Sequence, residues 1–576
     1  MGAFILYPTN TDVEKAQLLF EQKGFCKPLQ FSLGLFNLLL YPKIVYPQIN
    51  HFAAGNDMVI CVGTFLYKGQ QVLEGLQSFY YDFCEKRVDS NSVQGTFSLV
   101  LYVNGALYLT NDDENLYPVY VNHNKKIVSS SFLAIAEQLE TLSLNRLSVI
   151  ENLITGCSFG FDTYFNEIKR IRWGNEVNLP QEIQYLPLSK KSVILSKPNK
   201  KEAYSLQQQA LAKWFNTFSS FANQHGCEVG LSSGYDSRLL LALCLNHFNF
   251  NKVNVGSNHK NPPDDDLRTA RRLAQAVNKD CVEIPVVPTK DMTTEQLEHN
   301  FRMAFLFYDG QIRTNHGWSR EYRTAHYRKK VLGVSGLGLS GHAGEMLRND
   351  FNLDRFRFSY NKWILNNIIG KSGQQRIGNN HDLLQLVSYI KSKLKHIVDT
   401  NRKFININDV HRYYNEAWVQ SGPGIRTSIE NQLSYYASPF TDYNVSKTAY
   451  NLIHFLDDAR FEKRLINENC GDVAAVPYEI KNREFAPPFL NTTITYRLGI
   501  DIRHIFRMHI KKRNQKLSAN FKKMIKKHKF LQAVLNNPKL NELIPVDSYI
   551  SNCGDEAEQD RFIAFAFVLH MYSKKL

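Results

Sequence analysis

The sequence predicts two folds in series, stacked antiparallel sheets in residues 1–185 and a doubly wound parallel α/β sheet in residues 201–576. The first part is a run of short apolar segments, rich in β-branched and aromatic residues and separated by turn signals. The second part alternates short strands with helices, which is typical of a parallel sheet with crossover helices. Between the two, residues 186–200 hold two prolines and four lysines without a helical period, and we expect a linker there.

The strands expected in the first part are best marked at residues 58–66, 95–102 and 106–110. Asn104-Gly105 separates the last two, and this dipeptide is a strong signal for a two-residue β-hairpin turn. Residues 112–115, Asp-Asp-Glu-Asn, mark the next turn. These features predict antiparallel pairing.

In the second part, helices and strands are expected in turn, and the remainder up to residue 576 is expected to be mainly helical. Apolar residues at helical spacing predict the first helix, and a short strand follows it. Three aspartates open the third helix, where they suit the positive end of the helix dipole. The expected order is helix 202–224, strand 228–231, helix 237–247, strand 253–256, helix 264–277 and strand 282–286.

Composition excludes several classes of protein. The nine cysteines are scattered without a Cys-x-x-Cys pair, which argues against a zinc site and a disulfide framework. No apolar stretch approaches the ~20 residues needed to span a bilayer, and the first residues lack the features of a signal peptide. We therefore expect a cytoplasmic protein without a membrane span.

The net charge is +15, and much of the excess positive charge lies near the end of the chain, in basic runs at 511–513 and 522–529. Such runs can contact nucleic acid or an acidic membrane surface, but more often they form a solvated helix face. No nucleic-acid motif accompanies them, so we expect no nucleic-acid partner.

The segment richest in chemical information is the loop 232–237, Ser-Ser-Gly-Tyr-Asp-Ser, between an expected strand and an expected helix. Small residues let backbone N–H groups approach phosphate oxygens, and the helix N-terminus adds partial positive charge. Asp236 can bind magnesium held by those phosphates. The loop lacks the Gly-Lys-Ser/Thr of a Walker motif. The residues expected at the phosphates are Ser232, Ser233, Gly234, Asp236 and Ser237.

This loop resembles the Ser-Gly-Gly-x-Asp-Ser loop of enzymes that cleave ATP between the α and β phosphates, with Ser233 in place of the first glycine. Further segments in the same order resemble the asparagine synthetase domain. They are the acidic run 264–266, Ser-Gly-His-Ala-Gly-Glu at 340–345, Pro-Phe-Thr-Asp at 439–442 and the stretch 474–481. The resemblance covers most of residues 201–490 and implies an adenine nucleotide α-hydrolase-like fold.

The same resemblance implies roles for individual residues. Glu345 falls where the family has a magnesium-binding aspartate, so Asp236 and Glu345 are the expected magnesium ligands. Lys481 would stabilise negative charge on the transition state or on pyrophosphate, and His342 would orient substrate or take a proton. Val255 and Gly256 would lie beside the adenine, and Gly341 would contact the nucleotide.

Residues 1–185 resemble the class II glutamine amidotransferase domain that precedes this synthetase, which implies an α+β, Ntn-hydrolase-like fold. Val-Gln-Gly-Thr-Phe-Ser-Leu at 93–99 and Thr-Tyr-Phe-Asn-Glu-Ile at 163–168 are among the similar stretches. That domain needs an N-terminal cysteine as nucleophile, and here Met1 is followed by Gly2. We therefore expect that this domain does not hydrolyse glutamine.

Relatives without that cysteine include β-lactam synthetases and lasso-peptide cyclases, which form amides from an amine already present in their substrates. The resemblance thus implies an amide ligase dependent on ATP and Mg²⁺, acting on a small-molecule or peptide carboxylate such as an antibiotic precursor or a sugar acid. Two alternatives stay open: an asparagine synthetase that uses ammonia, and a catalytically degenerate binding or scaffold paralogue. The sequence also leaves open whether the chain forms a homodimer.

Overall fold

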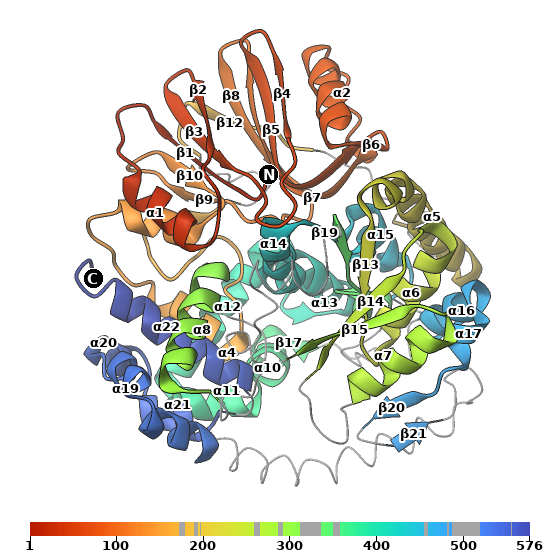
Figure 1. The fold of residues 1–576 in the computed structure, drawn as a ribbon. Helices are drawn as coiled ribbons and strands as arrows, with labels where there is room; N and C mark the ends of the chain where they lie inside the picture. Colours follow the sequence, from red (N-terminus) through yellow and green to blue (C-terminus); the bar gives the residue numbers. More distant parts are fainter. Residues whose placement is uncertain are drawn as a thin grey trace.

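The structure is a computed structural model, shown as a ribbon in Figure 1. It describes residues 1–171, 179–188, 194–195, 197, 199–257, 265–285, 292–311, 336–348, 358–453, 455, 459–480, 483–485, 519–553 and 556–576.

The first of two sheets in the N-terminal part is antiparallel, with the strand order β11-β9-β10-β1-β3-β2. Its longest pairing joins β1 and β3 over six residues, from Ala3 opposite Tyr41 to Pro8 opposite Phe36. Its strands are β1 (Ala3–Pro8), β2 (Leu29–Leu33), β3 (Phe36–Tyr41), β9 (Tyr120–Asn122), β10 (Ile127–Ser129) and β11 (Lys169–Arg170).

The second sheet has the order β12-β8-β7-β5-β4, with β6 also paired to β5, and only the β12–β8 pairing is parallel. The predicted hairpin is confirmed, because β7 and β8 pair antiparallel across Asn104-Gly105. Both turn residues have positive φ, as a type I′ turn requires. The strands are β4 (His51–Ala54), β5 (Asp57–Tyr67), β6 (Gln70–Gln71), β7 (Val93–Val103), β8 (Ala106–Asn111) and β12 (Ile183–Tyr185).

These two sheets form the middle layers of a helix–sheet–sheet–helix arrangement (Figure 1). Their facing sides share an apolar core that includes Phe4, Leu38 and Val62. Helices α1 (Glu14–Gln22) and α3 (Phe132–Gln138) pack on the outer side of the first sheet, and α2 (Val72–Cys84) packs on the outer side of the second. The antiparallel sheets were predicted from the sequence, but these covering helices were not.

The third sheet is parallel throughout, as predicted, with the order β15-β14-β13-β16-β19. The chain adds β14 and β15 on one side of β13 and then returns to add β16 and β19 on the other. The order therefore reverses between β13 and β16. The strands are β13 (Cys227–Gly230), β14 (Lys252–Ser257), β15 (Asp280–Pro285), β16 (Leu337–Leu339) and β19 (Tyr435–Ala437). The associated helices are α5 (Lys200–His225), α6 (Tyr235–His247) and α7 (Asp265–Ala276).

The described residues in the rest of the chain are mainly helical, as predicted, and α4 (Arg146–Thr155) joins their apolar core although α4 precedes the expected linker. The division at residues 186–200 stays a prediction. The other α-helices are α8 (Thr294–Phe307), α10 (Tyr360–Trp363), α11 (Gly370–Ile377), α12 (Asn380–Ile397), α13 (Ile407–Tyr413), α14 (Pro423–Leu433), α15 (Tyr443–Thr448), α16 (Arg460–Asn469), α17 (Gly471–Ala475), α19 (Lys529–Leu535), α20 (Pro538–Leu543), α21 (Val546–Ser551) and α22 (Glu556–Met571). A short two-stranded sheet pairs β20 (Tyr478–Ile480) with β21 (Arg483–Phe485).

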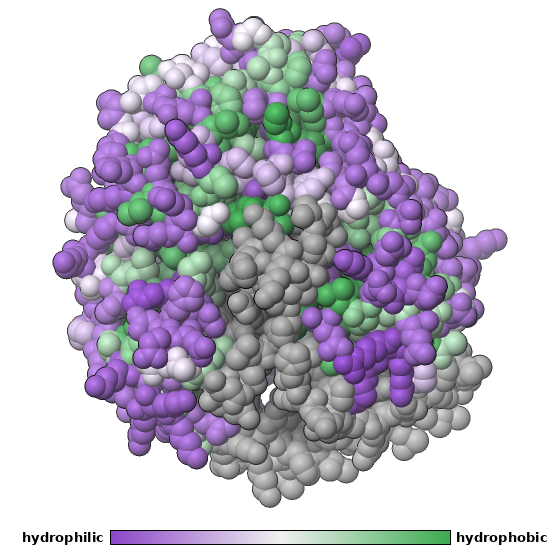
Figure 2. Space-filling view, in the orientation of Figure 1, coloured by the Kyte–Doolittle hydropathy of each residue, from purple (hydrophilic) through white to green (hydrophobic). Residues whose placement is uncertain are grey.

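Hydrophilic side chains cover most of the described surface on the face shown in Figure 2. The lysines at 522, 523, 526 and 527 are exposed on a helical stretch, as expected for a solvated helix face, whereas 511–513 lies outside the described residues. Among the described residues, no helix is both long and apolar enough to cross a membrane.

Candidate functional site

The candidate site lies where the strand order of the parallel sheet reverses. The loops that follow β13 and β16 leave the same edge of the sheet, because the two strands are parallel neighbours. Ligands of open α/β sheets bind at such a point. A cavity of about 470 Å³ opens there, which we call the first cavity. Among the residues predicted from the sequence, those that line it are Ser232, Asp236, Ser237, Val255, Gly256, Gly341, His342 and Glu345.

The loop between β13 and α6 is held by its own serines. The Ser237 hydroxyl accepts from the Ser232 N–H at 3.2 Å and lies 3.0 Å from the Ser232 hydroxyl. Gly234 is the N-cap residue of α6, and it lacks a side chain to cap the helix. The first turn of α6 therefore presents its backbone N–H groups near the cavity, as a phosphate site requires.

One part of the loop differs from the expectation. The N–H of Ser233 was expected to contact phosphate, but it donates to Asp266 Oδ1 at 2.8 Å, and the Ser233 hydroxyl donates to the same oxygen at 2.7 Å. Ser233 and Gly234 belong to the loop but are not on the cavity wall. Asp266 lies in the first turn of α7, and its carboxylate reaches across because α7 follows the neighbouring strand β14.

Two glycines explain why the loop after β16 can lie against the start of α6. A Cβ on Gly341 would stand 2.9 Å from Asp236 C and Ser237 N, and a Cβ on Gly344 would stand 2.6 Å from Asp236 Cβ. Any larger residue at either position would push the two loops apart. The close contact brings Glu345 to the same cavity as Asp236.

Asp236 belongs to a cluster of three carboxylates and one arginine. Arg348 Nη1 lies 2.6 Å from Asp236 Oδ1 and 2.8 Å from Glu462 Oε1. Burial and the neighbouring Asp236 charge raise the pKa of Glu345, and the same two causes raise the pKa of the fully buried Glu462. One arginine faces three carboxyl groups, and the raised pKa values of Glu345 and Glu462 favour a bound proton or a further cation in the cluster.

This donor set fits magnesium. In the part of the chain that is described, no group of three or more His, Cys, Asp or Glu side chains is arranged as a complete metal site. Magnesium bound with a nucleotide needs only one or two carboxylates, because phosphate oxygens and waters supply the other ligands. Asp236 and Glu345 can serve as that pair, and Arg348 would have to share Asp236 with the metal.

Arg348 and Glu462 were not predicted from the sequence. Arg348 follows Glu345 by three residues, and Glu462 lies on α16, over a hundred residues further on. Neither belongs to a motif, so only the fold could bring them to Asp236.

Lys481 lies outside the described residues, but the segment before it reaches the site region. The fully buried Arg238 of α6 donates to the carbonyl oxygens of Val476 and Pro477 at 2.7 and 2.8 Å. These bonds attach the stretch 476–477 to the helix that carries Asp236.

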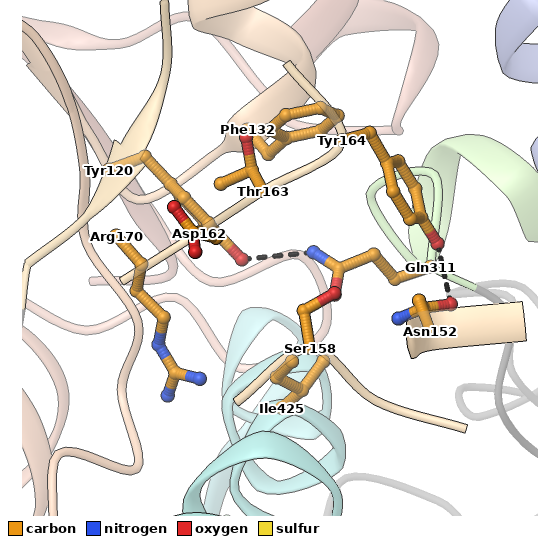
Figure 3. A pocket seen from close by; sticks show the side chains of 10 residues that line it. All are labelled: Tyr120, Phe132, Asn152, Ser158, Asp162, Thr163, Tyr164, Arg170, Gln311 and Ile425. Atoms are coloured by element: carbon orange, nitrogen blue, oxygen red, sulfur yellow. Dashed lines mark hydrogen bonds between the residues drawn. The ribbon is translucent and has the colours of Figure 1, made fainter. Parts of the chain in front are cut away.

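Two other cavities lie nearby. One of about 20 Å³, which has room for about one water, is lined by Tyr120, Asp162 and other residues (Figure 3). In it, the Gln311 amide donates to the Tyr120 hydroxyl at 3.0 Å. The other, about 320 Å³, is called the second cavity; it shares His342, Glu345, Pro423 and Arg426 with the first.

Position 2, where the resemblance would place a nucleophilic cysteine, has little free space around it. Gly2 donates its N–H to the Tyr41 carbonyl, and a Cβ on Gly2 would stand 2.9 Å from Phe25 and 3.0 Å from the Gln432 carbonyl oxygen. Met1 is buried, with its amino nitrogen 3.2 Å from the Cys61 carbonyl oxygen. A side chain at position 2 therefore has no space in this arrangement.

A scan against protein-family models and a search of curated proteins both give no match for the chain.

Proposed function

We propose that the protein is an ATP- and Mg²⁺-dependent amide ligase, which adenylates a substrate carboxylate and then joins it to an amine. The observation that supports this best is the first cavity itself. The cavity lies at the point where the strand order reverses, and Asp236 and Glu345 line it. It is next to the N-terminus of α6, where no described side chain caps the backbone N–H groups. A phosphate chain and its metal need these features together.

In this proposal the chain's own residues perform three tasks. The start of α6 and the hydroxyls of Ser232 and Ser237 bind phosphate oxygens. Asp236 and Glu345 hold the magnesium, whose charge would stabilise the leaving pyrophosphate. His342, which lines both cavities, would contact the substrate between them, where it can orient the attacking carboxylate or accept a proton from the amine.

The proposed reaction has two steps. A carboxylate oxygen attacks the α-phosphorus of ATP and pyrophosphate leaves. The amine nitrogen then attacks the acyl carbon, AMP leaves, and the nitrogen loses a proton. Lys481 keeps its proposed role in stabilising negative charge on the phosphates.

We further infer that the parallel sheet belongs to an adenine nucleotide α-hydrolase-like fold and the N-terminal sheets to an Ntn-hydrolase-like fold without glutaminase activity. The strand order of the parallel sheet and the four-layer arrangement support these assignments. The filled space at position 2 supports the loss of glutamine hydrolysis.

A second candidate is a nucleotide-binding module without catalysis, and the Arg348–Asp236 ion pair favours it. A guanidinium bound to the expected metal ligand reduces the charge that would attract magnesium. In that case nucleotide would bind with little dependence on magnesium.

The test measures ATP binding by calorimetry with and without Mg²⁺, and then AMP and pyrophosphate formation with a panel of carboxylic acids that includes aspartate with ammonia. Asp236→Asn and Glu345→Gln should each lower turnover roughly a hundredfold, since about 3 kcal/mol of transition-state stabilisation is lost with a metal ligand. Asp472→Asn, on an exposed position of α17, is the matched control and should behave like wild type.

The results distinguish the ligase, the binding module and the asparagine synthetase. ADP as product, or wild-type turnover in both site variants, would refute the ligase proposal. ATP binding with the same affinity with and without Mg²⁺, and without AMP formation, would favour the binding module. Turnover confined to aspartate and ammonia would identify an asparagine synthetase.

A further inference from the structure

The second cavity, of about 320 Å³, is built where three parts of the fold meet. Thr155 and Gly156 come from the end of α4, Tyr308 and Gln311 follow α8, and Arg561 lies on α22. It adjoins the first cavity through His342, Glu345, Pro423 and Arg426. A molecule bound in the second cavity would therefore have one end beside the proposed nucleotide.

Two arginines give this cavity its charge. Arg426 on α14 stands at the junction with the first cavity, and Arg561 stands only on the wall of the second. Both side chains are partly buried, and in each the Nε atom is buried with no hydrogen-bond acceptor in the part of the chain that the structure describes. Within the described residues, neither side chain forms an ion pair with a carboxylate. Buried guanidinium groups are normally paired, so both positions favour an anionic ligand.

The glycine at the end of α4 leaves space for the Arg561 side chain. Gly156 ends α4 in the left-handed conformation, at φ 87°, and a Cβ there would stand 3.3 Å from Arg561 Nη1. The backbone that turns away from α4 therefore borders the guanidinium directly. The rest of the wall is largely apolar, with Trp418, Ile425 and Ile429.

The carboxylate on the wall does not neutralise these arginines. Glu345 is shared with the first cavity, where Asp236 and Arg348 act on its pKa and where we assign it to the metal. The second cavity thus combines an apolar wall with one cation at the junction with the first cavity and another that lines the second cavity alone.

We propose that the second cavity binds the acid substrate, and that this substrate is a diacid: Arg426 orients the carboxylate to be activated, and Arg561 binds a second anionic group at the other end. The choice of which carboxylate faces the nucleotide rests on the proposed function, but binding of the diacid can be tested without nucleotide. Trp418 and the two isoleucines would contact the apolar chain between the two anionic groups.

The experiment compares linear dicarboxylates with monocarboxylates of equal length, from four to eight carbons. Dissociation constants are measured by calorimetry on the full chain, first alone and then with Mg²⁺ and α,β-methylene-ATP, which cannot release pyrophosphate. We expect at least one dicarboxylate to bind tenfold or more tightly than its matched monocarboxylate. Arg561→Gln should remove that preference, whereas Arg561→Lys should keep part of it.

Arg426→Gln should weaken both classes of acid because it contacts the carboxylate that they share. Arg464→Gln is the matched control, since Arg464 is exposed on α16 and pairs with Glu468. Melting temperatures verify that each variant is folded, and Arg561→Lys decides the question if Arg561→Gln does not fold.

Equal affinity for the two classes, a preference that survives in Arg561→Gln, or no binding of any acid would each overturn the inference. Failure of the analogue to bind, with the diacid preference intact, would count against the proposed function alone. Normal binding of the analogue without any diacid preference would count against the second-cavity assignment alone.

Discussion

At the scale of single residues, the loop after β16 contains a non-glycine residue in the left-handed region. Ala343 has φ 67° and ψ 12°, and its neighbours Gly341 and Gly344 make the close contact with Asp236. An L-residue in this conformation costs about 1–2 kcal/mol relative to glycine. The loop of the candidate site therefore carries a local strain.

We predict that Ala343→Gly raises the free energy of unfolding by about 1 kcal/mol, because glycine adopts this conformation without the Cβ clash. Urea denaturation measures the change. Ala449→Gly is the control: its φ of −61° is ordinary, so glycine there should destabilise the fold. A loss of stability in both variants would show that Ala343 is not strained.

The N-terminal glycine carries a second prediction at this scale. Gly2→Ala should destabilise the protein by about 1–3 kcal/mol, because the added Cβ meets the Gln432 carbonyl oxygen at 3.0 Å and Lys43 Cα at 3.2 Å, and backbone atoms cannot easily move. Thermal unfolding measures it. Gly471→Ala, where nothing lies within 4 Å, is the control and should leave the melting temperature unchanged or higher. Equal melting of Gly2→Ala and wild type would show that position 2 has room for a side chain.

The sequence could predict those site residues that lie in short continuous motifs. Asp236 lies in the first turn of the helix that follows β13, and Glu345 lies shortly after β16, so their meeting follows from strand order once the sheet is known to be parallel. Arg348, Glu462 and Arg561 could not be predicted, because each is an isolated polar residue whose place depends on tertiary packing.

At the scale of elements, the helices of the N-terminal part were missed because their local sequence also favours strands. Helix α2 contains Phe79, Tyr80, Tyr81 and Phe83, residues that favour strands, and it follows the strand-rich segment directly. Its helical signal was nevertheless present, because Val72, Leu76 and Phe79 are spaced for one face of a helix. All three are buried, and Leu76 and Phe79 lie in the core that α2 shares with the second sheet.

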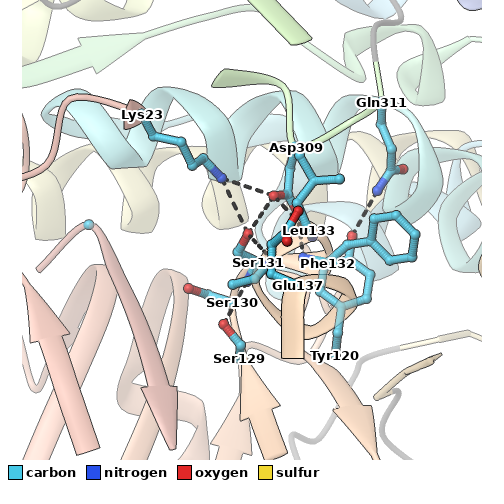
Figure 4. A network of polar contacts seen from close by, with 12 residues as sticks. Lys23, Tyr120, Ser129, Ser130, Ser131, Phe132, Leu133, Glu137, Asp309 and Gln311 are labelled. Atoms are coloured by element: carbon cyan, nitrogen blue, oxygen red, sulfur yellow. Dashed lines mark hydrogen bonds and ion pairs between the residues drawn. The ribbon is translucent and has the colours of Figure 1, made fainter. Parts of the chain in front are cut away.

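One buried carboxylate joins elements that are far apart in the chain (Figure 4). Asp309, just after α8, accepts the N–H of Phe132 at the start of α3 and the hydroxyl of Ser131. It also forms an ion pair of 2.9 Å with Lys23, which is buried too. Asp309 thus supplements the N-cap of α3 while it compensates a buried cation.

We predict that Asp309→Ala lowers the free energy of unfolding by about 3–5 kcal/mol, because Lys23 is left buried without its partner and the N-terminus of α3 loses an acceptor. Asp309→Asn should cost less, since the amide oxygen can still accept from Phe132. Denaturant unfolding measures both, with the exposed Asp547→Ala as control. If Asp309→Ala were as stable as the control, this connection would not contribute to folding.

At the scale of the whole molecule, the N-terminal sheets meet the parallel sheet through a polar contact inside the protein. Lys43, which follows β3, donates to the carbonyl oxygen of Asn431 at 2.6 Å and lies 3.3 Å from that of Ser434. Thr64 of β5 donates to the Asn431 side chain at 2.7 Å. Both contacts reach Asn431 in the last turn of α14, so they position this cavity-lining helix relative to the N-terminal sheets.

Lys43 is buried there without a carboxylate partner among the described residues, and burial lowers its pKa to about 7. The neighbouring groups that titrate are the Met1 amine, whose pKa is also lowered, and the Cys61 thiol, whose pKa burial raises to about 11. In the unfolded chain Lys43 keeps the ordinary lysine pKa near 10.5. Between about pH 7 and pH 10.5 the unfolded state therefore binds the proton that the folded state has released.

That difference fixes the sign of the last prediction. Where the unfolded state binds more protons, stability rises with pH, by about 1.4 kcal/mol per pH unit for one proton. Wild type minus Lys43→Met should show this rise between pH 7.5 and pH 10, and no slope below about pH 6, where both states hold the proton. The measurement is the free energy of unfolding in urea at a series of pH values. Lys523→Met, at an exposed lysine, should follow wild type throughout. Parallel pH profiles for wild type and Lys43→Met would mean that Lys43 remains charged at the contact between the sheets, and that its bonds to the two carbonyl oxygens compensate for its burial.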